Sequence, residues 1–115
     1  MSEIDVRCIP LEKANEHNKS CTLNTDFLAT AITPSYPPSM LRIFVCSQTA
    51  AKFKTRVTKA TNTQTLTFNA DTNLTANVPY MFTMLVHSGD TINFQFDTTL
   101  TMSVFRVQEI MLGTQ

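Results

Sequence analysis

Tryptophan is absent from this chain of 115 residues, and glycine and histidine occur only twice each. The two histidines, His17 and His87, have no cysteine or carboxylate at metal-ligand spacing, so the sequence offers no zinc site. No apolar run approaches the roughly 18 residues that cross a bilayer. The formal net charge is zero, so no overall field favours nucleic acid or a membrane surface. We therefore expect neither nucleic acid nor a membrane as a partner.

Catalytic groups are equally sparse. No phosphate-binding loop occurs, and nothing in the spacing brings a cysteine together with a histidine and an orienting third group. Asp71, Asp90 and Asp97 fall in expected turns, where an aspartate normally bonds nearby backbone amides. The sequence therefore predicts a protein that is not an enzyme, with no catalytic residues, no metal and no cofactor.

Three cysteines, an odd number, stand far apart at Cys8, Cys21 and Cys46. Their spacing does not require a disulfide, although one between two of them is possible. The first residues lack the basic and then apolar pattern of a secretory signal. We expect small, mostly buried thiols in a protein made in a reducing compartment.

What the chain does have is alternation. Threonine, a β-branched residue suited to the wet face of a sheet, is the commonest residue. From residue 40 onward apolar side chains recur with a period of two, which places them on one face of successive strands. About seven or eight strands, spaced roughly 10–12 residues apart, predict an all-β fold, an antiparallel β-sandwich or jelly roll. The expected inward side chains are Leu41, Ile43, Val45, Phe53, Val57, Leu66, Phe68, Tyr80, Phe82, Met84, Val86, Ile92, Phe94, Phe96, Leu100, Met102 and Val104.

Residues 80–110 show the alternation most clearly, as three runs joined by short turns. Paired as a β-meander with three-residue loops, they would place Val86 opposite Ile92 and Phe96 opposite Leu100. The alternative is that neighbouring strands lie in opposite sheets, as in many jelly rolls.

The period breaks at Val104 and Phe105. Either a β-bulge shifts the phase there, or the last strand is covered on both faces. Apolar residues left on nominally wet faces favour coverage, and a fold that gathers them would make a patch for a partner. With apolar residues of the N-terminal segment, the expected partner-binding residues are Ile4, Val6, Tyr36, Phe44, Met81, Leu85 and Phe105.

Residues 1–38 differ from the rest of the chain. Leu11–Lys19 reads as one or two helical turns with too few apolar residues to hold a helix alone. Leu23–Ile32 is a candidate strand, and the proline-rich stretch 34–38 imposes an extended backbone. The sequence predicts an extended arm over 1–38, held by its own domain, a neighbouring subunit or a larger assembly, and a β-sandwich domain over 39–115.

One cluster of charge stands out, a basic stripe of Lys52, Lys54, Arg56 and Lys59. The first three share one face of an expected strand. This pattern is typical of a solvated or edge strand that like charges protect from mispairing. It also fits a stripe that meets an acidic partner. Phe53 falls on the opposite face, so the aromatic and basic residues do not interleave as nucleic-acid binding requires.

Several strings in the second half resemble small β-sandwich proteins in the structural modules of tailed bacterial and archaeal viruses. They are Leu-Thr-Ala-Asn at 74–77, Tyr80-x-Phe82, Ser-Gly-Asp-Thr-Ile-Asn-Phe at 88–94 and Val-Phe-Arg-Val-Gln-Glu-Ile at 104–110. The resemblance covers about half of the chain and implies a virion component, such as a bacteriophage capsid decoration (cement) protein or a tail or fibre accessory. It implies the major coat protein or other virion subunits as partners, and location in the virion after synthesis in the host cytoplasm.

The expected function is therefore a non-enzymatic structural protein that cements neighbouring coat subunits through its arm and its apolar patch. A symmetric homo-oligomer, for instance a trimer, is the expected form. The alternative is a carbohydrate-binding or receptor-binding module, although Tyr36 and Tyr80 are the only tyrosines available for an aromatic platform. A small jelly-roll enzyme lacks the clustered histidines and carboxylates that such enzymes use.

Overall fold

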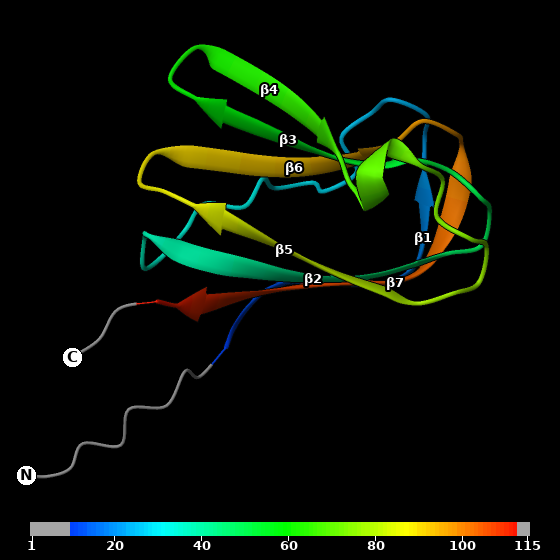
Figure 1. The fold of residues 1–115 in the computed structure, drawn as a ribbon, viewed down its shortest axis with the longest axis horizontal. Helices are drawn as coiled ribbons and strands as arrows, with labels where there is room; N and C mark the ends of the chain where they lie inside the picture. Colours follow the sequence, from blue (N-terminus) through cyan, green and yellow to red (C-terminus); the bar gives the residue numbers. More distant parts are fainter. Residues whose placement is uncertain (1–9, 113–115) are drawn as a thin grey trace, which may run out of the picture.

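A computed structural model describes residues 10–112 and contains seven strands and one short 3-10 turn. The elements are β1 (Leu11–Cys21), β2 (Ser39–Ser47), β3 (Phe53–Lys59), β4 (Asn62–Thr67), η1 (Asn69–Asp71), β5 (Tyr80–Val86), β6 (Asp90–Phe96) and β7 (Leu100–Met111). They form two antiparallel sheets, one of order β1-β7-β2-β5 and one of order β4-β3-β6. Figure 1 shows β3, β4 and β6 lying above β2, β5 and β7. The all-β class is confirmed, and the two sheets are compatible with a β-sandwich.

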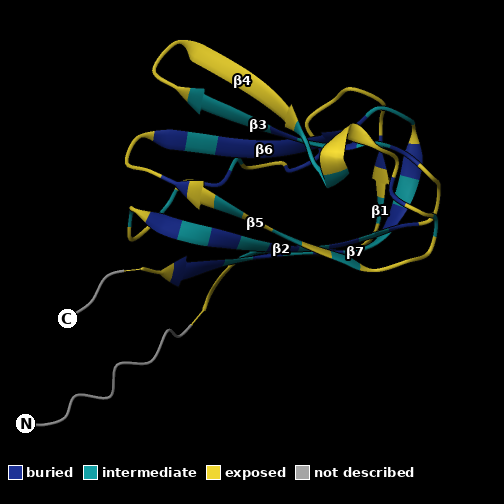
Figure 2. Cartoon of the chain, in the orientation of Figure 1, coloured by how far each residue is buried: buried dark blue, intermediate teal, exposed yellow. Residues whose placement is uncertain are grey.

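Phenylalanine side chains form the centre of the core between the sheets. Phe53, Phe94, Phe96 and Phe105 are fully buried, and Phe27 is 6% exposed. The ring of Phe27 meets that of Phe105 edge-on at a centroid distance of 4.9 Å, and Phe53 stacks on Phe94 at 5.6 Å. Such contacts add about 0.5–1.5 kcal/mol per pair to the burial of the rings. Figure 2 shows β6 almost wholly buried and β4 almost wholly exposed.

The expected meander over residues 80–110 is wrong, and its alternative is correct. Strands β5, β6 and β7 lie alternately in the two sheets, so neighbouring runs do not pair with one another. Val86 pairs with Ser39, and Phe96 pairs with Phe53. The inward phase of these runs was right as far as Met102, because alternation fixes which side chains face the core, but it does not fix which strand lies alongside.

A β-bulge explains the break in β7. Cys46 lies opposite Val104 while Ser47 lies opposite Met102, so Ser103 is an extra residue relative to β2. The phase shift turns Phe105 into the core, where it is fully buried, and leaves Val104 on the outer face. Coverage of both faces is therefore the wrong explanation. Phe105 was expected on a wet face and lies in the core, whereas Val104 was expected inward and lies on the outer face.

The helical turns expected over Leu11–Lys19 are absent, because these residues belong to β1. This strand pairs antiparallel with β7 from Leu11–Glu109 to Cys21–Leu100. A bulge between Glu12 and Ala14 makes Lys13 the extra residue. Thin apolar content cannot hold a helix, but a strand needs only one inward residue in two and a backbone partner, which β7 supplies.

The extended arm expected over residues 1–38 is not confirmed, because most of its described part lies in the sandwich. After β1, the segment 22–32 runs beside β6, with backbone hydrogen bonds from Phe27 to Phe94 (3.1 Å) and between Ile32 and Ile92 (2.8 Å). Phe27, Leu28 and Ile32 are buried. The strand expected over Leu23–Ile32 is thus an irregular segment with one bridge, and it covers the free edge of β6.

Two expectations about the smaller sheet also need correction. Leu66 was expected to face inward, but it is 56% exposed on β4, because β4 lies at the edge of its sheet. The first three residues of the basic stripe were assigned to a solvated or edge strand. The edge position is wrong, because Lys54 and Arg56 lie on β3, the middle strand, and Lys52 precedes it, although Lys52 and Arg56 are partly exposed.

Candidate interaction surface

The outer face of the four-stranded sheet carries an apolar patch on β2 and β5. Register places Met40 opposite Leu85, and Phe44 opposite Met81. Met81 is 56% and Leu85 61% exposed, and the two β2 residues are half-buried. We call these four residues the β2–β5 patch. Three of them, Phe44, Met81 and Leu85, were singled out from the sequence, and the fold brings them together.

Arg42 lies between the two apolar pairs of the patch, opposite Thr83. Its guanidinium carbon lies 5.7 Å from the centroid of the Phe44 ring, and its Nη2 donates to Gln108 Oε1 at 2.9 Å. The charge is thus spread over an aromatic face and tied to β7, while the stem of the side chain covers apolar surface. The Arg42 guanidinium is thus held against Phe44 and Gln108, and it leaves Met81 and Leu85 exposed.

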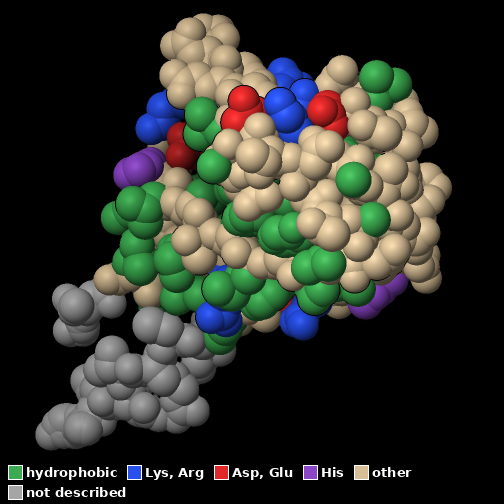
Figure 3. All heavy atoms as spheres, turned by 45° about the vertical axis from the view of Figure 1, so that its right-hand side comes forward, with side chains coloured by type: hydrophobic (Ala, Val, Ile, Leu, Met, Phe, Trp, Pro, Cys, Tyr) green, Lys and Arg blue, Asp and Glu red, His purple; other side chains and the backbone are tan. Residues whose placement is uncertain are grey.

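A small hollow with a volume of ≈ 290 Å³ lies at the end of β2 and β7, where Ser39 pairs with Met111. We call it the proline notch. Tyr36, 53% exposed, stands at this notch, and the peptide bond between Pro37 and Pro38 is cis. In Figure 3, hydrophobic side chains spread across the middle and lower part of the view, Lys and Arg lie beside Asp and Glu along its upper margin, and further basic side chains lie at the lower margin. The notch is lined by Tyr36, Pro37, Pro38, Met111 and Leu112.

A buried carboxylate holds the loop that forms the notch. Glu109 on β7 is 1% exposed and accepts hydrogen bonds from the backbone amides of Ser35 (2.8 Å) and Tyr36 (2.9 Å). The hydroxyl of Ser39 donates to the same carboxylate at 2.6 Å. Lys13 Nζ lies 3.5 Å from its Oε1. The bulge in β1 makes Lys13 the extra residue there, a position that re-aims side chains. We call this arrangement the Glu109 clamp.

Burial acts to raise the pKa of Glu109, but the hydrogen bonds from Ser39, Ser35 and Tyr36 and the charge of Lys13 outweigh it and hold the pKa below its ordinary value. The clamp was missed from the sequence. The sequence feature that could have revealed it is Glu109 itself, which shares the inward phase of Phe105 and Val107. A carboxylate that faces the core requires buried hydrogen-bond or ion-pair partners. That phase is readable only once the bulge in β7 is known.

The remaining residues expected to bind a partner do not join the patch. Ile4 and Val6 lie outside the described residues. Phe105 is in the core, and Tyr36 stands at the notch rather than on the sheet. Met40, which the sequence reasoning passed over, completes the patch because it shares the outward phase of Phe44.

The basic stripe is matched by acidic and polar groups of the same chain. Lys52 lies 3.3 Å from Asp71, and Arg56 lies 3.1 Å from Asp26. Lys54 donates to the side-chain oxygen of Asn24 at 2.7 Å, and the fourth member, Lys59, lies 3.8 Å from Asp90. The alternative interpretation, a stripe that meets an acidic partner, is weakened because these side chains already contact groups of the same chain.

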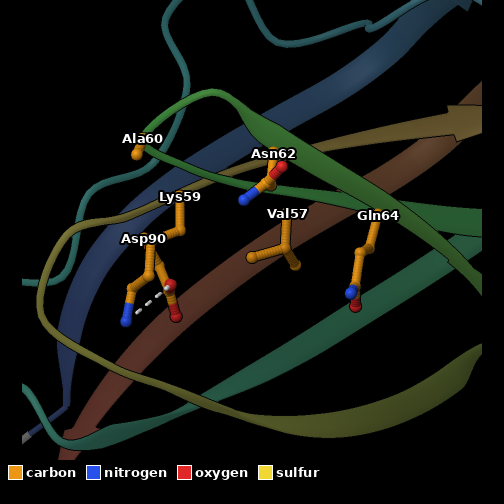
Figure 4. Close-up of a pocket in the computed structure, with 6 residues that line it drawn as sticks. All are labelled: Val57, Lys59, Ala60, Asn62, Gln64 and Asp90. Atoms are coloured by element: carbon orange, nitrogen blue, oxygen red, sulfur yellow. Dashed lines mark ion pairs between the residues drawn. The ribbon is translucent and has the colours of Figure 1, made fainter.

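A second hollow, ≈ 530 Å³, lies against the β3–β4 hairpin. Figure 4 shows Lys59 and Asp90 together at one end, with Val57 and Gln64 along it. Asp90 Oδ2 also accepts from the backbone amide of His87 at 2.8 Å, which holds the turn before β6. Its polar groups thus serve the local fold, and the hollow gathers no chemistry beyond one ion pair.

The described thiols are unpaired. Cys21 is buried, and burial raises its pKa to about 11, so this thiol is a poor nucleophile. Cys46 is half-buried on the outer face, and Cys8 lies outside the described residues. Over residues 10–112, no three histidine, cysteine or acidic side chains gather where they could hold a metal ion.

In the part of the chain that the structure covers, no helix is long and apolar enough to cross a membrane. Comparison with protein-family models, with curated proteins and with solved structures gave no significant match.

Proposed function

We propose that this chain is a non-enzymatic structural protein of a virus particle, and specifically a capsid decoration protein that stabilises neighbouring coat subunits. The strand order supports the proposal. If segment 22–32 is counted as an eighth strand beside β6, the two sheets have four strands each, ordered β1-β7-β2-β5 and 22–32-β6-β3-β4. We interpret this order as a jelly roll, an architecture found in viral capsid proteins. A fold shared with capsid proteins does not determine a function, which depends on the surface that the fold presents.

The observation that carries the proposal is the β2–β5 patch. Two side chains more than half exposed, Met81 and Leu85, stand next to Met40 and Phe44 on a flat sheet face. Exposed apolar clusters of this kind mark surfaces that another protein covers. Burying them against coat subunits would stabilise the particle by about 25 cal/mol per Å² of apolar area. Because residues 11–32 lie in the sandwich, the proposed contact is through the patch rather than through an arm.

Immunogold labelling of purified particles tests the location. An antibody against the purified chain should label the capsid surface of the virus that encodes it. Label confined to the tail would replace the cement function by that of a tail or fibre accessory. Particles without label would refute a virion function.

Binding to particles that lack the chain tests the patch. We expect Met40→Lys to weaken binding at least about tenfold, because burial of an unpaired charge costs more than 1.4 kcal/mol. Met40 lies on β2, an interior strand, so weaker binding by this variant would show that the partner contacts the face of the sheet rather than its edge. Leu66→Lys is the matched control, since Leu66 is exposed on β4 in the other sheet. Equal binding by both variants would contradict the proposal.

A further inference from the structure

The four outer strands of the two sheets are protected to different degrees. An unpaired sheet edge is a template for another strand, and proteins blunt it with charges, bulges, short length or a covering segment. Segment 22–32 covers β6. A bulge and four charged side chains interrupt β1. Six residues make up β4, and Leu66 is its only apolar side chain.

None of these devices protects β5. Its seven residues, Tyr-Met-Phe-Thr-Met-Leu-Val, carry no charge and pair with β2 without any register shift. Within residues 10–112, the backbone of Met81–Leu85 has hydrogen bonds only to β2. Its outward side chains Met81, Thr83 and Leu85 are exposed, and the inward Phe82 and Met84 are only half-buried. The strand thus presents both a bare backbone edge and apolar side chains on both faces.

We propose that β5 pairs antiparallel with β5 of a second copy of this chain, about a two-fold axis at Thr83. Antiparallel self-pairing about a residue n brings n+k of one copy opposite n−k of the other. In this register Met81 lies opposite Leu85 on the outer face, and Phe82 lies opposite Met84 on the inner face. The most exposed apolar residues, Met81 and Leu85, thereby become cross-strand neighbours. The two-fold axis forms this pair twice, once on each side of Thr83.

The sequence around β5 favours this axis over its neighbours. An axis at Thr83 pairs all seven residues of β5, with Tyr80 of each copy opposite Val86 of the other. An axis at Phe82 would bring Pro79, which has no amide donor, into the ladder opposite Leu85. An axis at Met84 would place Met81 opposite His87, which opens the turn before β6.

The size of the contact sets its strength. A seven-residue strand is about 24 Å long, so the interface falls at the low end of specific interfaces, below about 1,200 Å². With no charge on either strand, two copies meet without repulsion. We therefore expect a dimer that dissociates on dilution. Because the contact is isologous, it closes at two copies and does not build the trimer considered from the sequence.

This inference does not depend on the virion function. Pairing through the edge leaves the outer face open and joins the β2–β5 patches of two copies into one surface across an eight-stranded sheet. A coat subunit could then contact both copies at once.

Cysteine crosslinking of the isolated full chain tests the register. Cys8 and Cys46 are first changed to serine, and Cys21 is kept because its thiol is buried. We expect Thr83→Cys to form a disulfide-linked dimer of twice the 12.9 kDa chain mass under oxidised glutathione, because opposed residues lie within disulfide reach. Met81→Cys and Leu85→Cys should each run as a monomer on a non-reducing gel when oxidised alone. A mixture of the two variants should form the disulfide-linked dimer, because residues 81 and 85 of different copies lie opposite each other.

Thr65→Cys is the matched control, an exposed threonine on the edge strand β4. Crosslinking of Thr65→Cys as fast as Thr83→Cys would mean random collision and would overturn the proposal. Sedimentation of the unmodified chain from about 1 mM to about 1 μM, a range that spans weak affinities, gives a second readout. We expect dimer at the high end and monomer at the low end, and Thr83→Lys should shift the midpoint at least about tenfold upward. A monomer throughout would equally overturn the proposal.

Discussion

The two outer strands of the four-stranded sheet, β1 and β5, solve the same problem in opposite ways. Eleven residues form β1, four of them charged, and it has a bulge at Lys13 and a positive φ of 51° at Asn18. Seven uncharged residues in an unbroken register form β5. The charges and the bulge of β1 hinder pairing with a further strand, whereas β5 has neither.

The charges of β1 also serve the fold from within. Lys13 reaches Glu109, and the carboxylate in turn holds the backbone of Ser35 and Tyr36. The devices that blunt this edge thus help to seat the loop of the proline notch. On β5 the hydroxyl of Tyr80 accepts a hydrogen bond from the backbone amide of Thr75 at 2.9 Å, but the strand has no charged side chain that could form an anchor like that of Lys13 and Glu109. The difference supports the proposal that β5, and not β1, pairs with a second copy of the chain.

The largest effect on stability should come from breaking the clamp on the β1 side. Glu109→Gln keeps the shape of the side chain but removes the charge opposite Lys13 and one acceptor for the amides of Ser35 and Tyr36. Leaving buried donors unpaired should lower the free energy of unfolding by about 2–4 kcal/mol. Urea denaturation followed by circular dichroism measures this. A loss below about 0.5 kcal/mol, which is the usual effect of a substitution on the protein surface, would show that the clamp does not stabilise the fold.

The same carboxylate should make stability depend on pH. Hydrogen bonds hold the pKa of Glu109 below its ordinary value in the folded chain. The unfolded chain therefore takes up the proton at a higher pH than the folded chain. The contribution of the clamp is complete above the ordinary glutamate pKa of about 4.3 and is lost as pH falls through the lowered folded-state pKa. Below about pH 4, the stability of the unmodified chain should fall more steeply than that of Glu109→Gln. Parallel pH profiles would contradict this assignment.

Sequence alternation predicted the strands of the sandwich well but not their neighbours. Ile92, Phe94 and Phe96 were assigned inward and are fully buried, because a period of two fixes the buried face whichever strand lies alongside. The pairing of β5 with β2 joins residues about 40 apart in the chain, and no local pattern records such a choice. The β1 strand was missed for a related reason, since its partner β7 lies at the other end of the chain.

The candidate surface was predicted in part. Phe44, Met81 and Leu85 break the apolar-in pattern on unshifted strands, so their outward direction could be read directly. Phe105 looked the same but lies beyond the β7 bulge, which reverses its direction. The Glu109 clamp needed both that bulge and the one at Lys13. Bulges depend on long-range pairing, and they limited what the sequence alone could say.

The smallest effect on the free energy of unfolding should come from substituting an exposed side chain on each edge strand, Glu12 on β1 and Met81 on β5. Glu12, whose side chain is 40% exposed, pairs with Arg106 at 3.1 Å across the β1–β7 ladder, and Glu12→Gln makes the same chemical change as Glu109→Gln at a wet site. An exposed pair contributes about 0–1 kcal/mol, and Met81→Ser on β5 removes an exposed side chain at comparable cost. Both variants should unfold within about 1 kcal/mol of the unmodified chain. Only Met81→Ser should also weaken self-association in sedimentation, because its edge is the one that a second copy covers. A weakened dimer with Glu12→Gln would instead place the contact on β1.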